Sequence, residues 1–186
     1  MKKLYAIALC VAVTASVVAV TMIISGNTNF ATAEEQTPTA KPDSEAIERS
    51  RKTVQTLDNI FKQTIVLITD KYVHDEDDFA AGSAAVLLFK NISEAGDNKV
   101  RLIDATGEPY DAENVAKDDF EREGIKRLKA GAPIYESVVT TDGKHQLRAL
   151  TAVPVVMQKC VMCHAHYADA KKGEPIGAIS YTVPVE

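Results

Sequence analysis

The stretch PIYESVVTTDGKHQLRALTAVPVV, residues 133–156, decides the fold of this 186-residue chain. Two runs rich in Val, Ile, Leu and Thr flank the dipeptide Asp142-Gly143, and such runs around Asp-Gly are the strongest short-range signal for a β-hairpin. Residues 99–104 (KVRLID) and 176–185 (IGAISYTVPV) also favour strands. We therefore predict an antiparallel sheet of about four or five strands.

Helical periodicity precedes the sheet. Apolar side chains recur at spacings of three and four over residues 45–73, which predicts an amphipathic helix of roughly 30 residues. Asp43 or Ser44 would cap its first turn. The residues expected on its apolar face are Val54, Leu57, Phe61, Thr64 or Ile65, Ile68 and Tyr72.

Two shorter helices are also predicted. Asp77 or Asp78 would cap a helix over residues 79–93, which places Ala81, Ala85, Leu88 and Ile92 on one side. A charged helix over residues 119–131 would end with Gly131 as its C-cap. Helices segregated from an antiparallel sheet give the fold class α+β.

The first 33 residues have the form of an export signal. Lys2 and Lys3 precede an apolar run over residues 4–24, and Ala31-Thr32-Ala33 is the small-x-small pattern that signal peptidase accepts. The run is long enough to span a bilayer, so an uncleaved N-terminal anchor remains the alternative. We expect residues 34–44 to form a linker, residues 45–186 the domain, and the location to be periplasmic or otherwise extracytoplasmic.

Cleavage after Ala33 would leave 153 residues with 19 basic and 26 acidic side chains, a net charge of −7. This acidic balance argues against binding to nucleic acid or to an anionic membrane surface, leaving the N-terminal anchor as the only expected membrane contact. Cys10 would be lost with the signal, so Cys160 and Cys163 would be the only cysteines.

Those two cysteines belong to the motif KCVMCHAH, residues 159–166. Cys160, Cys163 and His164 match C-x-x-C-H, the attachment signature of c-type haem. Two thiols three residues apart can reach the two vinyl groups of one haem, and the adjacent His164 then faces the iron. Haem is attached outside the cytoplasm, in agreement with the export signal, so we predict one covalent haem c.

Other readings of the motif stay open. Cys160 and Cys163 could form a structural disulfide or a thioredoxin-type redox pair, or bind zinc together with His164 or His166. No βαβ unit and no second zinc-ligand pair supports the last two. Among haem proteins, the common small cytochromes are disfavoured because no methionine follows His164, and the four-helix-bundle class because the flanking segments resemble strands.

The arrangement around the motif resembles a known family. Residues 147–167 (LRALTAVPVVMQKCVMCHAHY) and 171–185 (KKGEPIGAISYTVPV) are similar to the C-terminal signature of the haem-c-binding, PAS-like domains formerly of unknown function. Residues 113–128 (ENVAKDDFEREGIKRL) are similar to the middle helix of that family. The resemblance covers residues 45–185 and implies a PAS-like sheet with a long N-terminal helix. It also implies an iron ligand from that helix, where the family has a cysteine and this chain has none.

The remaining histidines provide candidates for the sixth iron ligand. His166 is too close to His164 to reach the opposite face of the haem, and His145 falls at the tip of the predicted hairpin. We therefore predict bis-histidine ligation by His164 and His74, with a solvated His74 in an acidic turn as the alternative. Arg148 is the predicted partner of a haem propionate; Arg101 and Lys159 could share that role or be ordinary surface charges.

These predictions favour a monohaem protein that acts in redox sensing or electron transfer with an unidentified partner protein. A sensor of CO or NO with a displaceable sixth ligand is the alternative, and a disulfide protein without haem is a more remote one. No acid–base pair for catalysis can be picked out, so we do not expect an enzyme.

Overall fold

The computed structural model describes residues 41–75, 79–162, 165–171 and 173–186. The predicted export signal, Asp77, Asp78, Cys163 and His164 lie outside these ranges. The helices are α1 (Ser44–Tyr72), α2 (Ala81–Ala95), α3 (Asp119–Lys129) and the short 3-10 turns η1 (Ala112–Asn114), η2 (Gln158–Val161) and η3 (Ala165–Asp169). The strands are β1 (Lys99–Asp104), β2 (Ile134–Thr141), β3 (Lys144–Pro154) and β4 (Pro175–Pro184). Among the described helices, none is both long and apolar enough to cross a membrane.

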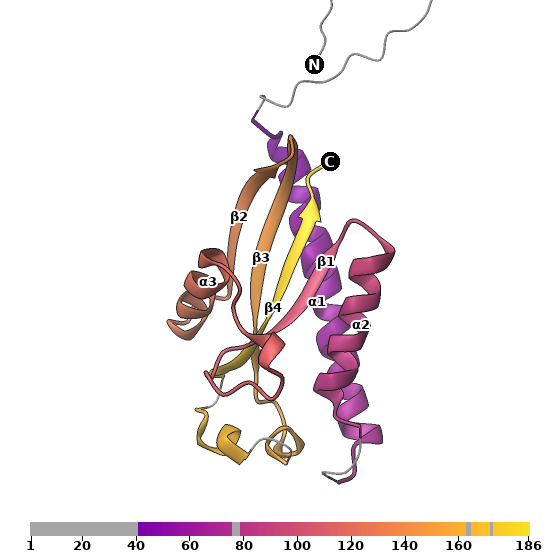
Figure 1. Cartoon of the computed structure of the whole chain (residues 1–186), viewed down its shortest axis with the longest axis vertical. Coiled ribbons are helices and arrows are strands. Elements are labelled where there is room, and N and C mark those ends of the chain that lie inside the picture. Colours follow the sequence, from indigo (N-terminus) through magenta and orange to yellow (C-terminus); the bar gives the residue numbers. More distant parts are fainter. Residues whose placement is uncertain (1–40, 76–78, 163–164, 172) are drawn as a thin grey trace, which may run out of the picture. The chain divides into compact units, whose positions relative to one another are not determined.

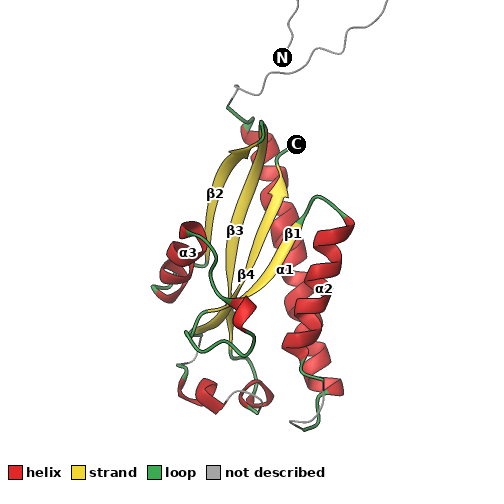
Figure 2. Cartoon of the chain, in the orientation of Figure 1, coloured by secondary structure: helices red, strands yellow, loops and turns green. Residues whose placement is uncertain are grey.

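The strands form one antiparallel sheet in the order β1-β4-β3-β2, so the predicted α+β class is confirmed (Figures 1 and 2). The β2–β3 hairpin turns at Asp142 and Gly143, whose φ angles are 50° and 74°. Positive φ at both central residues is the geometry that Asp-Gly favours, so the predicted hairpin is confirmed. The last strand, β4, lies between β1 and β3 and is the most deeply buried of the four.

Helices α1 and α2 pack on one face of the sheet (Figure 1). Asp43 accepts a hydrogen bond from the Glu45 amide, which confirms the predicted cap of α1. The main core lies between these helices and the alternate inward residues of β3 and β4, because side chains two apart on a strand share a face. Its buried members include Val54, Phe61, Ala85, Phe89, Leu147, Ala149, Ile179 and Tyr181.

Helix α3 covers part of the opposite face and encloses a smaller core of Ile103, Leu128, Leu150 and Ala178. Gly131 follows its end with φ 95°, and the amides of Gly131 and Ala132 bond the carbonyls of Leu128 and Arg127. This pattern is a Schellman motif, so the predicted glycine C-cap is confirmed.

Three details of the predicted helices are wrong. Helix α2 begins after Ala80, which has no side-chain cap, rather than after Asp77 or Asp78. Its buried residues are Ala81, Ala85 and Phe89, which share one face because they lie four residues apart, whereas Leu88 is 38% exposed. Tyr72 is 73% exposed because α1 extends past the end of the sheet.

Candidate functional site

The segment that contains the haem-attachment motif lies at one end of the sheet. Strand β3 ends at Pro154, and the chain passes through η2 and η3 before it returns to the sheet as β4. Figure 1 shows these turns below the sheet, beside the end of α1. Cys163 and His164 fall outside the described residues, so their predicted roles stay predictions.

Lys159 joins this segment to the end of α1. Its Nζ atom donates hydrogen bonds to the carbonyl oxygens of Asp70 and Val73, each at 2.8 Å, and to that of Thr69 at 3.4 Å. The last carbonyls of a helix have no partner within the helix, and a cation at that end also interacts favourably with the helix dipole. The residue directly before Cys160 is therefore fixed beside the helix end that precedes His74.

Cys160 is a half-buried free thiol. Tyr167 lies close enough to interact with it: burial, the charge of Asp104 and the Cys160 thiol together raise the pKa of Tyr167 to about 12. The ring of Tyr167 also meets the ring of His166 edge-on, with 4.5 Å between the centroids.

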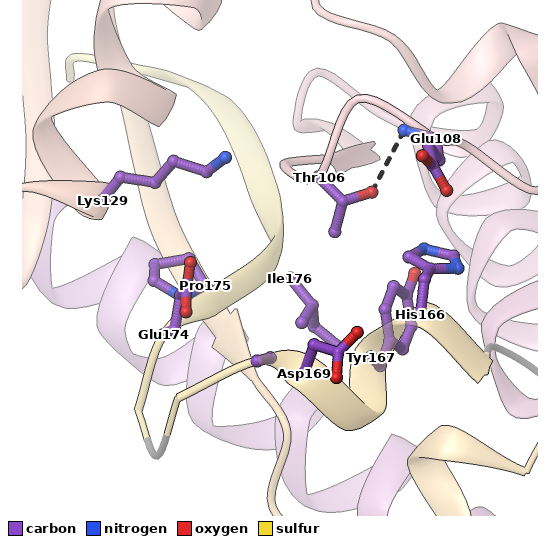
Figure 3. Close-up of a pocket in the computed structure, with 10 residues that line it drawn as sticks. Thr106, Glu108, Lys129, His166, Tyr167, Asp169, Glu174, Pro175 and Ile176 are labelled. Carbon is purple, nitrogen blue, oxygen red and sulfur yellow. Dashed lines mark hydrogen bonds between the residues drawn. The ribbon is translucent and has the colours of Figure 1, made fainter.

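A pocket of about 240 Å³ opens next to this segment (Figure 3). It is lined by polar side chains from four parts of the chain, among them Thr106, Glu108, Lys129, His166, Asp169 and Glu174. Pockets that enclose drug-sized ligands are larger, at ~300–1,000 Å³. A large planar group would therefore have to lie across this end of the domain rather than inside the pocket.

Large apolar side chains are exposed at the same end of the domain. Tyr72 at the end of α1 is 73% exposed, Phe79 before α2 is 66% exposed, and Val156 between β3 and η2 is 58% exposed. Chain continuity and the Lys159 contacts place all three near the motif. This end of the domain therefore carries apolar side chains as well as the polar pocket.

The three described histidines occupy different places. His74 is exposed and lies two residues after the end of α1, because the backbone at Val73 is already extended. His74 therefore does not continue the apolar face of α1, and its role as an iron ligand stays a prediction. His145 lies at the hairpin end of β3, and Nδ1 of His145 is 2.8 Å from Thr140 Oγ1. Nine residue steps along β3, about 30 Å, separate it from Pro154 at the other end of the strand.

His166 lines the pocket beside the motif, and its Nε2 atom is buried. The ring of His166 meets the ring of Tyr167 and shares the pocket with Pro175 and Ile176 at the start of β4. Sequence reasoning could not find this contact, since it depends on how η3 folds back on the sheet.

Arg148 lies on β3, on the face that carries α3. Its guanidinium is 2.8 Å from the Asp118 carboxylate and 4.2 Å from the centre of the Phe120 ring. Burial opposes ionisation of Asp118, but hydrogen bonds from Arg148 and from the Glu121 amide outweigh it, so the pKa of Asp118 is lowered. The predicted propionate contact of Arg148 stays a prediction. Arg101 likewise has internal partners, since it bonds the buried carboxylate of Glu121.

Residues 33–184 match the Tll0287-like family, Tll0287. The chain belongs to this family. Tll0287-like proteins are known for a haem-binding domain of PAS-like fold, and the four-stranded antiparallel sheet with its flanking helices is compatible with that fold. No curated protein matches the chain. The family resemblance predicted from residues 45–185 is confirmed to this extent.

The sequence does not reveal two features of this Tll0287-like site. Lys159 is predicted to meet a propionate or to be a surface charge, whereas it caps α1. The sequence shows both the lysine and the end of the predicted helix. They lie about 90 positions apart, however, and no local pattern indicates that they meet. The position of Tyr167 near the charge of Asp104 depends in the same way on tertiary packing.

Proposed function

We propose that the protein is an exported monohaem c-type protein that acts in redox sensing or electron transfer. The observation that carries the proposal is the position of Lys159, which fixes the residue before Cys160 against the end of α1, next to His74. Family membership supports the same proposal, because the family is known for haem binding.

The residues at this end fit a haem. Cys160 offers a free thiol, and the exposed side chains of Tyr72, Phe79 and Val156 offer apolar surface to a macrocycle. Cys160 and Cys163 would hold the group through thioether bonds, and His164 would be its proximal ligand. His74 would be the second axial ligand, since an exposed imidazole in a short connection can turn toward iron.

Haem would supply one-electron exchange at its iron. The protein would set the reduction potential through its axial ligands, and two imidazoles give a lower potential than histidine with methionine. Tyr167 would keep its proton throughout the physiological range, because its pKa is about 12, and so would not add a charge beside Cys160.

The first test is covalent haem in protein made by a host that matures c-type cytochromes. The expected result is a haem-stained band that survives denaturation and is weakened or lost in Cys160→Ser and Cys163→Ser. Met157→Leu leaves the motif intact and serves as the matched control. A colourless protein, or one with a disulfide between the two cysteines, would contradict the proposal.

The second test separates electron transfer from gas sensing. A six-coordinate iron with two histidine ligands should give low-spin spectra in both redox states and bind CO slowly or weakly. A rapid spectral shift of the reduced protein at low CO concentration would contradict the redox role and favour a gas sensor.

A further inference from the structure

A second pocket lies on the face of the sheet that carries α3. It has a volume of about 290 Å³, close to the lower bound of ~300 Å³ for ligand pockets, so only a small molecule would fill it. The polar residues that line it on the sheet are Lys99, Arg101, Arg148, Ser180 and Thr182.

The strand register explains why these side chains converge. Thr182 of β4 is paired with Lys99 of β1 on one side and with Arg148 of β3 on the other. Ser180, two residues earlier on the same face, is paired with Arg101. Neighbouring strands are about 4.8 Å apart, so Thr182 lies between Lys99 and Arg148, whereas Ser180 lies between Arg101 and the apolar Leu150.

Donors in this pocket exceed the acceptors around it. Arg101 has five N–H groups, and within the described ranges it makes three hydrogen bonds, to the Glu121 carboxylate and to the carbonyls of Glu113 and Val115. Arg148 has an ion-pair contact to Asp118. Ser180 and Thr182 add two hydroxyl groups to the pocket lining, each with one O–H donor. Both guanidinium groups therefore keep N–H donors that can turn to a ligand.

The charge of the pocket is also positive. Within the described part of the chain, four cationic side chains line it against the single carboxylate of Glu121. Two further carboxylates, Asp118 and Glu113, pair with Arg148 and Lys117 at its margin, which leaves one positive charge in excess. The Arg101 and Arg148 side chains are only 27% and 19% exposed, so their attraction for an anion is less screened than at an open surface.

We propose that this pocket binds a small oxyanion from solution, a carboxylate or phosphate that Arg101 and Arg148 hold from two sides while Ser180 and Thr182 donate from below. The planar guanidinium group matches the two oxygens of a carboxylate or phosphate. A haem propionate has the same chemistry and is the other source of such a group. The pocket does not depend on the proposed haem role, so either proposal can fail alone.

The test measures binding of malonate, citrate and phosphate to the purified protein by calorimetry at low ionic strength. Ser180→Ala and Thr182→Val keep every ion pair, and each should weaken binding about 2–10-fold. Arg148→Gln should weaken it at least about 10-fold. The matched control is Lys126→Gln, which removes one positive charge from the exposed side of α3 and should leave the affinity unchanged.

Equal affinity in all these variants, or no binding by the parent protein and by its haem-free Cys160→Ser variant, would overturn the proposal. Binding that appears only in Cys160→Ser would assign the pocket to a haem propionate and overturn a ligand from solution. The haem stain of Arg148→Gln should equal that of the parent, which separates this pocket from the haem-attachment end.

Discussion

Single side chains at the end of α1 connect the motif to the rest of the domain. Lys159 donates hydrogen bonds to three carbonyl oxygens that have no partner within the helix. The helix ends at Tyr72, and the backbone is extended at Val73. His74 is thus presented on a short connection whose position is fixed by a lysine from the motif. The two residues should act together on any group bound between them.

His74→Ala tests the second axial ligand. Loss of one imidazole should turn a low-spin haem spectrum high-spin and let CO bind the reduced iron readily. His145→Ala, at the far end of β3, is the control and should keep the parent spectrum. An unchanged low-spin spectrum in His74→Ala would rule out His74 as the ligand.

Lys159→Met tests the cap of α1. The substitution removes the hydrogen bonds to the last carbonyls and the favourable charge at the helix end, so we expect a loss of about 1–3 kcal/mol in the free energy of unfolding. Urea unfolding followed by circular dichroism measures it. Lys52→Met, at an exposed position of α1, should change stability by less than about 0.5 kcal/mol. A similar loss in both variants would show that the contacts of Lys159 are unimportant.

At the scale of elements, close approach fixes how α3 lies on the sheet. A Cβ atom at Gly124 would be 2.8 Å from Leu150 Cδ2 and 3.0 Å from Tyr135 Cδ1. Glycine is therefore required by packing on β2 and β3, although the same residue lowers the intrinsic stability of a helix. Asp118 reinforces this arrangement, because it caps α3 through the Glu121 amide and also binds Arg148 of β3.

Gly124→Ala should destabilise the domain by about 1–3 kcal/mol, since α3 must move away from Leu150 to accept the methyl group. Gly82→Ala is the matched control, because nothing lies within 4 Å of a Cβ atom at that position in α2. There the substitution should raise stability by about 0.5–1 kcal/mol. Thermal unfolding of the two variants measures both effects, and a stabilising Gly124→Ala would contradict the packing argument.

At the scale of the whole molecule, a buried polar network ties α1 to the sheet. The Asp58 carboxylate accepts hydrogen bonds from Tyr181 Oη at 3.0 Å and from Thr151 Oγ1, and pairs with Lys62 at 2.9 Å. Tyr181 is fully buried at the centre of β4. Burial, followed by the charge of Asp58 and its hydrogen bond, raises the pKa of Tyr181 far above its usual value.

The raised pKa makes stability depend on pH in the alkaline range. Unfolded tyrosine loses its proton near pH 10, whereas folded Tyr181 keeps it. The free energy of unfolding should therefore be constant below pH 10 as far as Tyr181 is concerned, and should fall by about 1.4 kcal/mol per pH unit above pH 10. Tyr181→Phe should be less stable by about 1.5–3 kcal/mol at pH 8, and this deficit should narrow between pH 10 and 11. Urea unfolding midpoints at pH 8 and pH 11 measure the deficit, with Tyr72→Phe at an exposed position as the control. A constant deficit would contradict the pKa shift.

Local patterns in the sequence determined most of the elements. Asp142-Gly143 sets both positive φ angles of the hairpin, Gly131 ends α3, and the spacing of Val54, Leu57 and Phe61 sets the buried face of α1, because each signal depends on neighbours within a few residues. The C-x-x-C-H pattern predicts the chemistry of the motif in the same local way.

Only the tertiary structure decided which distant groups meet. The sheet order β1-β4-β3-β2 inserts the last strand at the centre, which brings Tyr181 to Asp58 and places Ser180 and Thr182 in one pocket with Arg101 and Arg148. Lys159 reaches α1 across about 90 positions, and Phe89 rather than Leu88 faces the core. Contacts of this kind depend on strand order, register and the shape left between packed elements, and no spacing within one segment encodes them.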